Sequence, residues 1–186
     1  MTGSQVYLRP LTGEDAAAFV PWVNDAEVTR TLAVGAAVMD RQAEQAWIEK
    51  MNASGSDVPF GIVVQKTDRL IGSIGLSQID FRHRSASLGM VIGEKSMWGK
   101  GYGTEATRLK VRYAFEELHL NRVQLHVYEY NLRGIRVYEK VGFRREGVLR
   151  QEHVYDGRFW DTVVMAILRE AWEKRSALPA SEPSKT

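Results

Sequence analysis

The chain has 186 residues, no cysteine and a formal net charge of +2. This length fits one ordinary globular domain, and the near-neutral charge gives no argument for a nucleic acid or a membrane surface as a partner. The absence of cysteine excludes disulfides, thiolate zinc sites and a cysteine nucleophile.

The N-terminal segment has no basic stretch followed by an apolar run, so it is unlike a secretory signal. No segment approaches the ~20 apolar residues of a membrane helix. These features predict a cytoplasmic protein. We expect one domain over residues 1–176 and a flexible tail over 177–186, where prolines and serines leave little to pack.

Apolar periodicity predicts alternating strands and helices in the first half of the chain. A helix at 40–51 places Ala43, Ala46, Trp47 and Met51 on one apolar face. The predicted elements are a strand at 6–9, helices at 12–24 and 40–51, a hairpin of strands at 60–64 and 70–79, and a strand at 85–93.

The second half continues with a helix, a strand and a helix before a closing hairpin. Gly142 follows the second of these helices at the position where glycine commonly ends one, and Asp156-Gly157 is a strong hairpin-turn signal. The predicted elements are a helix at 104–117, a strand at 123–128, a helix at 132–141, strands at 146–155 and 159–168, and a helix at 169–175. Together they predict an α/β (α+β) fold, with a mixed sheet of about seven strands flanked by helices.

A glycine-rich turn, Gly99-Lys100-Gly101-Tyr102-Gly103, lies between a predicted strand and a predicted helix. Its glycines let the backbone come close to a ligand, and the N-terminus of the helix adds partial positive charge, so the turn is typical of a phosphate site. It matches neither the Walker pattern nor the dinucleotide-binding pattern. Alone, such a turn is as often a plain turn as a binding site.

A second motif follows the next strand and reads Asn-Leu-Arg-Gly-Ile-Arg-Val-Tyr-Glu-Lys-Val-Gly-Phe over residues 131–143. Together with the glycine-rich turn it resembles the GNAT superfamily of N-acetyltransferases. The resemblance covers residues 7–168 and is greatest to the ribosomal-protein N-terminal and spermidine acetyltransferase branch, which the segment at 155–161 also resembles.

The resemblance implies a splayed sheet whose fourth and fifth strands part to admit the pantetheine arm of acetyl-CoA, with no metal. It also implies direct transfer of the acetyl group to a primary amine, without an acyl-enzyme. The implied cofactor contacts are the backbone of Val91, Ile92 and Gly93, the turn residues Trp98, Gly99, Lys100, Gly101, Tyr102, Gly103 and Thr104, and the side chains of Asn131, Arg136 and Tyr138.

Tyr138 is the expected general acid. It lies seven residues after Asn131, two helical turns along, so both side chains can line one face beside the bound arm. A phenol is a suitable proton donor to a departing thiolate. The structural alternative is a core tyrosine that packs the helix.

The group that takes the amine's proton is less well defined by the sequence. His126 lies in the preceding strand, where some relatives carry a glutamate, and an imidazole titrates near neutrality. A lone strand histidine is more often structural. Glu94 and Glu129 are weaker candidates, and Glu105 is better explained by a favourable interaction with the helix dipole.

Two residues depart from the family pattern. Trp98 stands where glutamine or arginine often begins the turn, which removes a side-chain donor, and Gly134 stands where alanine or serine is usual. Arg133, Arg136 and Lys140 either meet the ribose phosphate of the cofactor or form the solvated face of a helix.

The acceptor is expected to be a small amine or a protein N-terminus. Residues 30–39 contain no carboxylate, which counts against a polycationic substrate, although Asp25, Glu27 and Asp40 lie nearby. The alternatives are a polyamine acetyltransferase and a catalytically silent, coenzyme-A-binding regulatory module. Members of the branch often pair, so a homodimer is possible, but no segment marks an interface.

A nucleic-acid-binding module using Arg82, His83 and Arg84 is a weak alternative, because only Phe81 is at hand to stack on a base. We expect neither nucleic acid nor membrane among the partners.

Overall fold

The computed structural model describes residues 1–32 and 38–176, so the tail expected at 177–186 lies outside the described residues. In chain order the elements are β1 (Val6–Pro10), the 3-10 turn η1 (Gly13–Asp15), α1 (Ala16–Val23), α2 (Ala26–Thr29), α3 (Arg41–Ala53), β2 (Val58–Val64), β3 (Arg69–Asp80), β4 (Ser85–Ile92), the 3-10 turn η2 (Lys95–Met97), α4 (Tyr102–Glu116), β5 (Arg122–Tyr128), α5 (Leu132–Val141), β6 (Arg144–Tyr155), β7 (Arg158–Leu168) and α6 (Arg169–Ser176).

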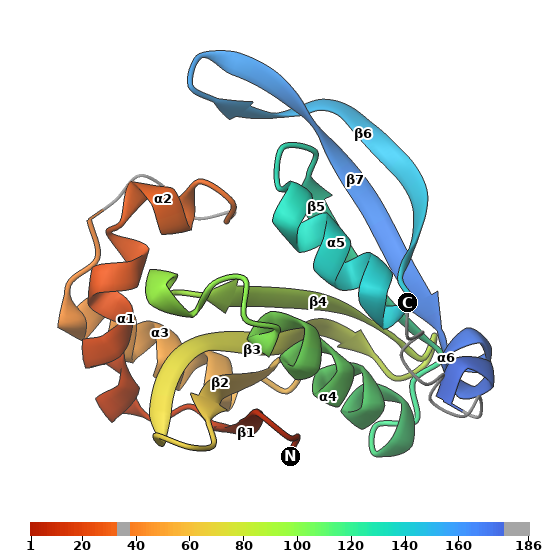
Figure 1. Ribbon diagram of the computed structural model, residues 1–186, viewed down its shortest axis with the longest axis horizontal. Helices are drawn as coiled ribbons and strands as arrows, with labels where there is room; N and C mark the ends of the chain where they lie inside the picture. The colour runs from red at the N-terminus through yellow and green to blue at the C-terminus, as the bar shows by residue number, and fades with distance from the viewer. Residues whose placement is uncertain (33–37, 177–186) are drawn as a thin grey trace, which may run out of the picture.

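The strands form one mixed seven-stranded sheet in the order β1-β2-β3-β4-β5-β7-β6, which confirms the expected fold class. Every neighbouring pair is antiparallel except β4 and β5, which run parallel. These two strands pair only from Ser85 opposite Arg122 to Ser87 opposite Gln124, and then they part. The rest of β4 is paired with β3 alone, so the sheet opens in its middle (Figure 1).

The last two strands form a long hairpin that arches away from the rest of the sheet above α5 (Figure 1). Its turn holds Asp156 at φ 52° and Gly157 at φ 69°. Two positive φ angles are what a two-residue type I′ turn requires, which explains why Asp-Gly is a strong hairpin signal.

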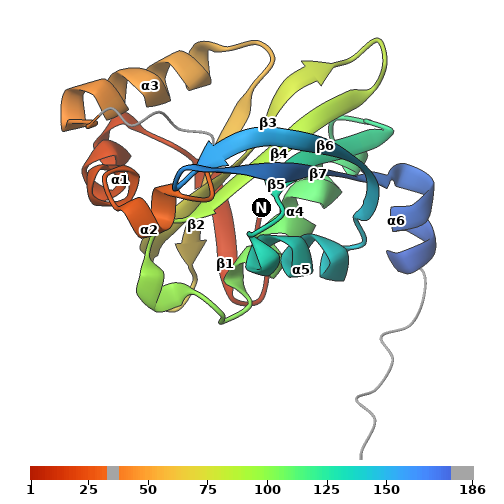
Figure 2. The same ribbon diagram turned by 90° about the horizontal axis from the view of Figure 1, so that it is seen from above.

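Two groups of helices flank the sheet (Figure 2). The larger apolar core joins α4 and α5 to the strands and includes Phe115 and Ile135. A smaller core lies under α1 and α3 and includes Phe19, Trp22 and Ile48. The larger core includes strand residues from both sides of the opening, such as Leu88 of β4 and Leu125 of β5, so the two halves of the sheet share one core despite the opening.

The face of α3 differs from the prediction. Ala43 and Ala46 are exposed, whereas Glu44 and Ile48 are the buried positions of the helix. An i, i+4 pair lies on one face of a helix, and here that face includes a carboxylate. Apolar periodicity does not predict this face, because one of its buried residues is charged.

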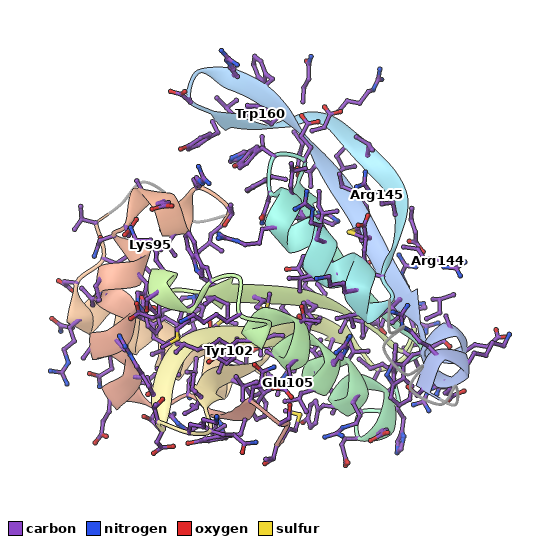
Figure 3. The ribbon with its side chains drawn as sticks, in the orientation of Figure 1. Lys95, Tyr102, Glu105, Arg144, Arg145 and Trp160 are labelled. Atoms are coloured by element: carbon purple, nitrogen blue, oxygen red, sulfur yellow. The ribbon has the colours of Figure 1, made fainter. Side chains whose placement is uncertain are left out.

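Helix α4 carries two polar side chains with structural roles. Glu105 lies in the first turn of this helix (Figure 3). Its carboxylate accepts hydrogen bonds from the backbone N–H groups of Ser4, Gln5 and Val6 at 2.6–2.9 Å, and so holds the N-terminal segment against α4. Lys110 is fully buried; its Nζ donates to the carbonyl of Val58 at 2.8 Å. Burial lowers the pKa of Lys110 to about 7.

Candidate functional site

The open edge of β4 forms one wall of a cleft in the middle of the sheet. Gly93 N–H donates to the carbonyl of Ile71 on β3 at 2.9 Å. Because an antiparallel ladder alternates, the polar groups of Val91 point toward β3 as well, and those of Met90 and Ile92 point into the opening. The carbonyl of Ile92 accepts Trp98 Nε1–H at 2.6 Å.

The glycine-rich turn forms the end of the cleft. Gly99 and Gly101 have φ angles of 76° and 89°, a region that side chains with Cβ rarely adopt, and nothing lies within 4 Å of where a Cβ of Gly99 would be. Gly101 is the N-cap of α4, so the first amides of this helix have no intrahelical acceptor. Tyr102 marks the start of this helix in Figure 3. Unpaired amides and the helix dipole together provide a cradle for an anion.

Helix α5 forms the opposite wall and is capped by Asn131. Its Oδ1 accepts the backbone N–H of Gly134 at 2.9 Å, which leaves the Nδ2–H₂ group available to the cleft. A Cβ on Gly134 would lie 2.7 Å from Nδ2 of Asn131. The glycine at this position therefore makes room for the cap.

Tyr138 lies two turns along α5 and lines the same cleft with only 7% of its surface exposed. Its ring packs edge-on against Phe143, with centroids 5.7 Å apart. No described group is hydrogen-bonded to its hydroxyl. Burial raises the pKa of Tyr138 to about 12, so the phenol keeps its proton at neutral pH.

The cleft encloses about 610 Å³ between β4, the turn and α5. Most residues expected to bind the cofactor line it, but Gly93 and Lys100 do not. The expected residues that line it are Val91, Ile92, Trp98, Gly99, Gly101, Tyr102, Gly103, Thr104, Asn131, Arg136 and Tyr138. Gly93 instead packs closely on the ring of Trp22, and the side chain of Lys100 is exposed.

Three cationic side chains of α5 also line the cleft: Arg133, Arg136 and Lys140. The guanidinium of Arg133 stacks on the ring of Trp98, 3.7 Å from its centroid, and so connects α5 to the turn. Cation–π contacts of this kind are favourable by about 0.5–2 kcal/mol. The sequence did not predict the contact, because it depends on how closely the two walls approach.

A second, apolar cavity of about 470 Å³ lies between α3 and the face of β3 and β4. It shares Leu32, Met90 and Val91 with the cleft, so the two spaces meet at β4. Trp47 and Met51 of α3 line this apolar cavity, as does Glu44, which is 4% exposed. Glu44 cannot be recognised as a lining residue from the sequence, because nothing local shows that its side chain faces inward.

The three residues that the sequence offers as proton acceptors, His126, Glu94 and Glu129, line neither the cleft nor the apolar cavity. His126 is exposed on β5. Because side chains alternate along a strand, it lies on the same face of the sheet as the apolar cavity. Glu94 accepts the hydroxyl of Ser96 at 2.8 Å and pairs with Arg69, and these partners hold its pKa below the ordinary value. Glu129 accepts the backbone N–H of Asp161 at 2.9 Å.

Within residues 1–32 and 38–176, no group of three or more acidic or histidine side chains is placed to hold a metal ion. None of the helices in these ranges is both long and apolar enough to cross a bilayer.

Comparison with known proteins places these features in context. A family model described as an acetyltransferase (GNAT) domain matches residues 5–144. An uncharacterised N-acetyltransferase of Bacillus licheniformis is 30% identical over 167 residues, which are 89% of this chain and 93% of that protein. A Bacillus subtilis protein provisionally named a ribosomal N-acetyltransferase is 38% identical over 104 residues, 56% of each chain.

Among solved structures, the spermidine N-acetyltransferase of Vibrio cholerae in complex with CoA and spermine superimposes with a TM-score of 0.84 at 26% identity. The match covers 92% of this chain and 99% of that one. The resemblance found in the sequence is therefore confirmed at the level of the family and of the spermidine and ribosomal branch.

Proposed function

The chain belongs to the GNAT family of acetyltransferases, and on this premise we propose that it moves an acetyl group from acetyl-CoA directly to a primary amine, either a small amine or a protein N-terminus. The observation that carries the proposal is the cleft itself. One space is lined by residues of β4, by the anion cradle at the start of α4 and by the buried Tyr138 of α5.

The described residues fit coenzyme A. The first amides of α4 would hold the diphosphate, and the open space beside Gly99 lets the backbone approach it. The outward polar groups of Met90 and the backbone N–H of Ile92, with Nδ2 of Asn131, would hydrogen-bond the pantetheine arm. Arg136 and Lys140 line the cleft and would be available to the ribose phosphate. Acetyl-CoA supplies the activated acyl carbon.

Tyr138 would act as the general acid. As the amine nitrogen forms its bond to the acyl carbon, the carbon–sulfur bond breaks and the phenol gives its proton to the leaving sulfur. Burial raises the pKa of Tyr138 to about 12, so the phenol is protonated at neutral pH, but this value lies above the pKa of a thiol and makes the buried phenol a weaker acid than the thiol that it would form. A coenzyme-A-binding module without catalysis would have no need of an acid at this position.

The amine must also lose a proton, and His126 stays the predicted acceptor. Since its side chain is exposed on the cavity face of the sheet and lines neither space, the proton would travel through water. The cytoplasmic location, the possible homodimer and the lack of nucleic-acid or membrane partners likewise stay predictions.

The test is an acetyl-CoA-dependent screen of small amines, polyamines and N-terminal peptides, read as a mass increase of one acetyl group. The expected result is transfer to at least one amine, with release of free coenzyme A in equal amount. Binding of acetyl-CoA without transfer to any member of a broad panel would favour the silent module and contradict the proposal.

A further inference from the structure

The apolar cavity is open because glycines stand on the strands at its base. Gly75 of β3 lies directly opposite Gly89 of β4, and both line the cavity. The neighbours of Gly89 along the strand, Leu88 and Met90, pack with the larger core, so the Cβ direction at Gly89 points to the opposite face, toward α3. Nothing lies within 4 Å of the place where a Cβ of Gly89 would be. A side chain at this position would therefore occupy part of the 470 Å³ of the cavity.

The walls of the cavity are apolar. Phe19 and Val23 of α1 and Trp47 and Met51 of α3 line it. Glu44 is the single charged side chain among the lining residues that the structure describes, and burial raises its pKa, the direction expected in surroundings that disfavour charge. A space of this volume is in the range of small-molecule sites, roughly 300–1,000 Å³. Its walls favour an apolar occupant.

The cavity lies next to the proposed place of the reaction. Leu32 and Val91 line both the cavity and the cleft. Val28 and Thr31 also line the cleft, and Val28 belongs to the smaller core, on the side of the sheet that α1 and α3 cover (Figure 2). Tyr138 lines the same cleft from α5. The cleft therefore passes through the opening between β4 and β5, from the side of α5 to the side of the cavity.

We propose that the cavity binds the apolar body of the acetyl acceptor, while the amine nitrogen of the same molecule stays in the cleft beside the thioester. The acceptor is then a small primary amine with one large apolar group and no second charge. This rests on the proposed acetyltransferase function and specifies its substrate class. A second ammonium group inside the cavity would lose its hydration and find one carboxylate, that of Glu44, for its three N–H donors. Diamines are therefore poorer acceptors than monoamines of the same length.

Binding gives the first test and needs no turnover. The probe is 1-hexanol, a neutral analogue of an alkylamine, titrated calorimetrically into protein saturated with coenzyme A. Each methylene group that is buried strengthens binding about fourfold. Gly89→Leu, which fills room for about two such groups, should therefore weaken the binding of 1-hexanol by roughly tenfold. Equal affinities in Gly89→Leu and the wild type, or no saturable binding to the wild type, would overturn the proposal.

The matched control is Gly147→Leu. Gly147 lies on β6, lines neither space and likewise has nothing within 4 Å of its Cβ position. The control adds the same side chain to a strand of the same sheet and should bind 1-hexanol like the wild type. If both variants lose affinity equally, the loss reflects a general change of the protein and the proposal fails. Should Gly89→Leu not fold, Gly89→Ala adds one carbon atom at the same place and should weaken binding about fourfold.

Kinetics give the second test, through a ratio that general damage to the enzyme leaves unchanged. In the wild type, kcat/KM should rise about fourfold per methylene from propylamine to hexylamine, and hexylamine should be preferred to 1,6-diaminohexane. Gly89→Leu should lower the ratio of kcat/KM for hexylamine to that for propylamine by roughly tenfold, with the KM for acetyl-CoA unchanged. An unchanged ratio, or a preference of the wild type for the diamine, would refute the assignment.

The proposed function and the assignment of the cavity fail separately. If no amine is acetylated but 1-hexanol binds and Gly89→Leu weakens its binding, acetyl transfer fails and the cavity stands as a site for an apolar ligand. If the wild type and Gly89→Leu acetylate amines with the same dependence on chain length, acetyl transfer stands and the assignment of the cavity fails.

Discussion

Replacing Lys110 by methionine should stabilise the protein, most strongly below neutral pH. The ammonium group of Lys110 is fully buried in the larger core, and its described partners are the carbonyl of Val58 and the rings of Phe60 and Tyr113, with no carboxylate among them. Its pKa falls from an ordinary 10.5 to about 7 because burial disfavours the charged form. At about 1.4 kcal/mol per pKa unit, the charged form costs the fold about 5 kcal/mol.

The sign follows from proton binding. Between about pH 7 and pH 10 the unfolded chain holds the proton on Lys110 more tightly than the folded protein does, so this contribution makes stability rise with pH. Below pH 7 the full cost is present. Lys110→Met should therefore gain the most at pH 6, and its advantage over the wild type should fade as the pH approaches 10.

The assay is urea unfolding of the wild type and of Lys110→Met at a series of pH values. The difference between their free energies of unfolding removes the contribution of every other titrating group, because both proteins share those groups. A gain of several kcal/mol at pH 6 that shrinks steadily toward pH 10 is expected. The hydrogen bond and ring contacts of the ammonium group make 5 kcal/mol an upper bound. A difference that does not change with pH would refute the reasoning, because it would mean that Lys110 titrates alike in both states.

The remaining predictions concern the cleft. Tyr138→Phe should lower kcat by at least about tenfold while the KM for acetyl-CoA is unchanged; unaltered turnover would remove Tyr138 from the role of acid, and Tyr113→Phe, outside the cleft, is the control. Gly101→Val should weaken acetyl-CoA binding by roughly tenfold or more, because valine resists a φ of 89° and would distort the turn that forms the cradle. Gly147→Val, at a glycine with open space around it, should bind normally, and equal affinities in the two variants would count against the cradle. His126→Gln should flatten the acid limb of the pH–rate profile, and an unchanged profile would exclude His126 as the base.

Much of the fold could be predicted because its signals are local. The Asp156-Gly157 turn and the helix that ends at Gly142 each follow from the backbone angles that neighbouring residues prefer, and Gly142 indeed has a φ of 117°. The parting of β4 and β5 came from the resemblance, since a pattern of apolar residues does not show where two distant strands stop pairing.

The details of the cleft depend on contacts between distant segments. Trp98 is not the usual residue of the family at this position. Its indole N–H donates to the carbonyl of Ile92, and its ring stacks against the guanidinium of Arg133. A Cβ at Gly134 would lie 2.7 Å from Nδ2 of Asn131, the residue that caps the helix. Neither relation can be read from spacing, because each depends on distances of a few ångströms between side chains.

Glu44 shows the same limit most clearly. Residues 30–39 contain no carboxylate, whereas Glu44, which lines the apolar cavity, lies in the first turn of the following helix. An acid at that position is ordinary on an exposed helix face. Only the packing of α3 on the sheet shows that Glu44 lines an apolar cavity.

The most direct measurement is a crystal structure of the protein with coenzyme A bound. The diphosphate should lie against the amides of residues 99–104, the pantetheine arm should lie between the parted ends of β4 and β5, and the sulfur should face the hydroxyl of Tyr138. Coenzyme A bound outside the cleft, or a cleft closed by its own side chains with the ligand elsewhere, would contradict the account.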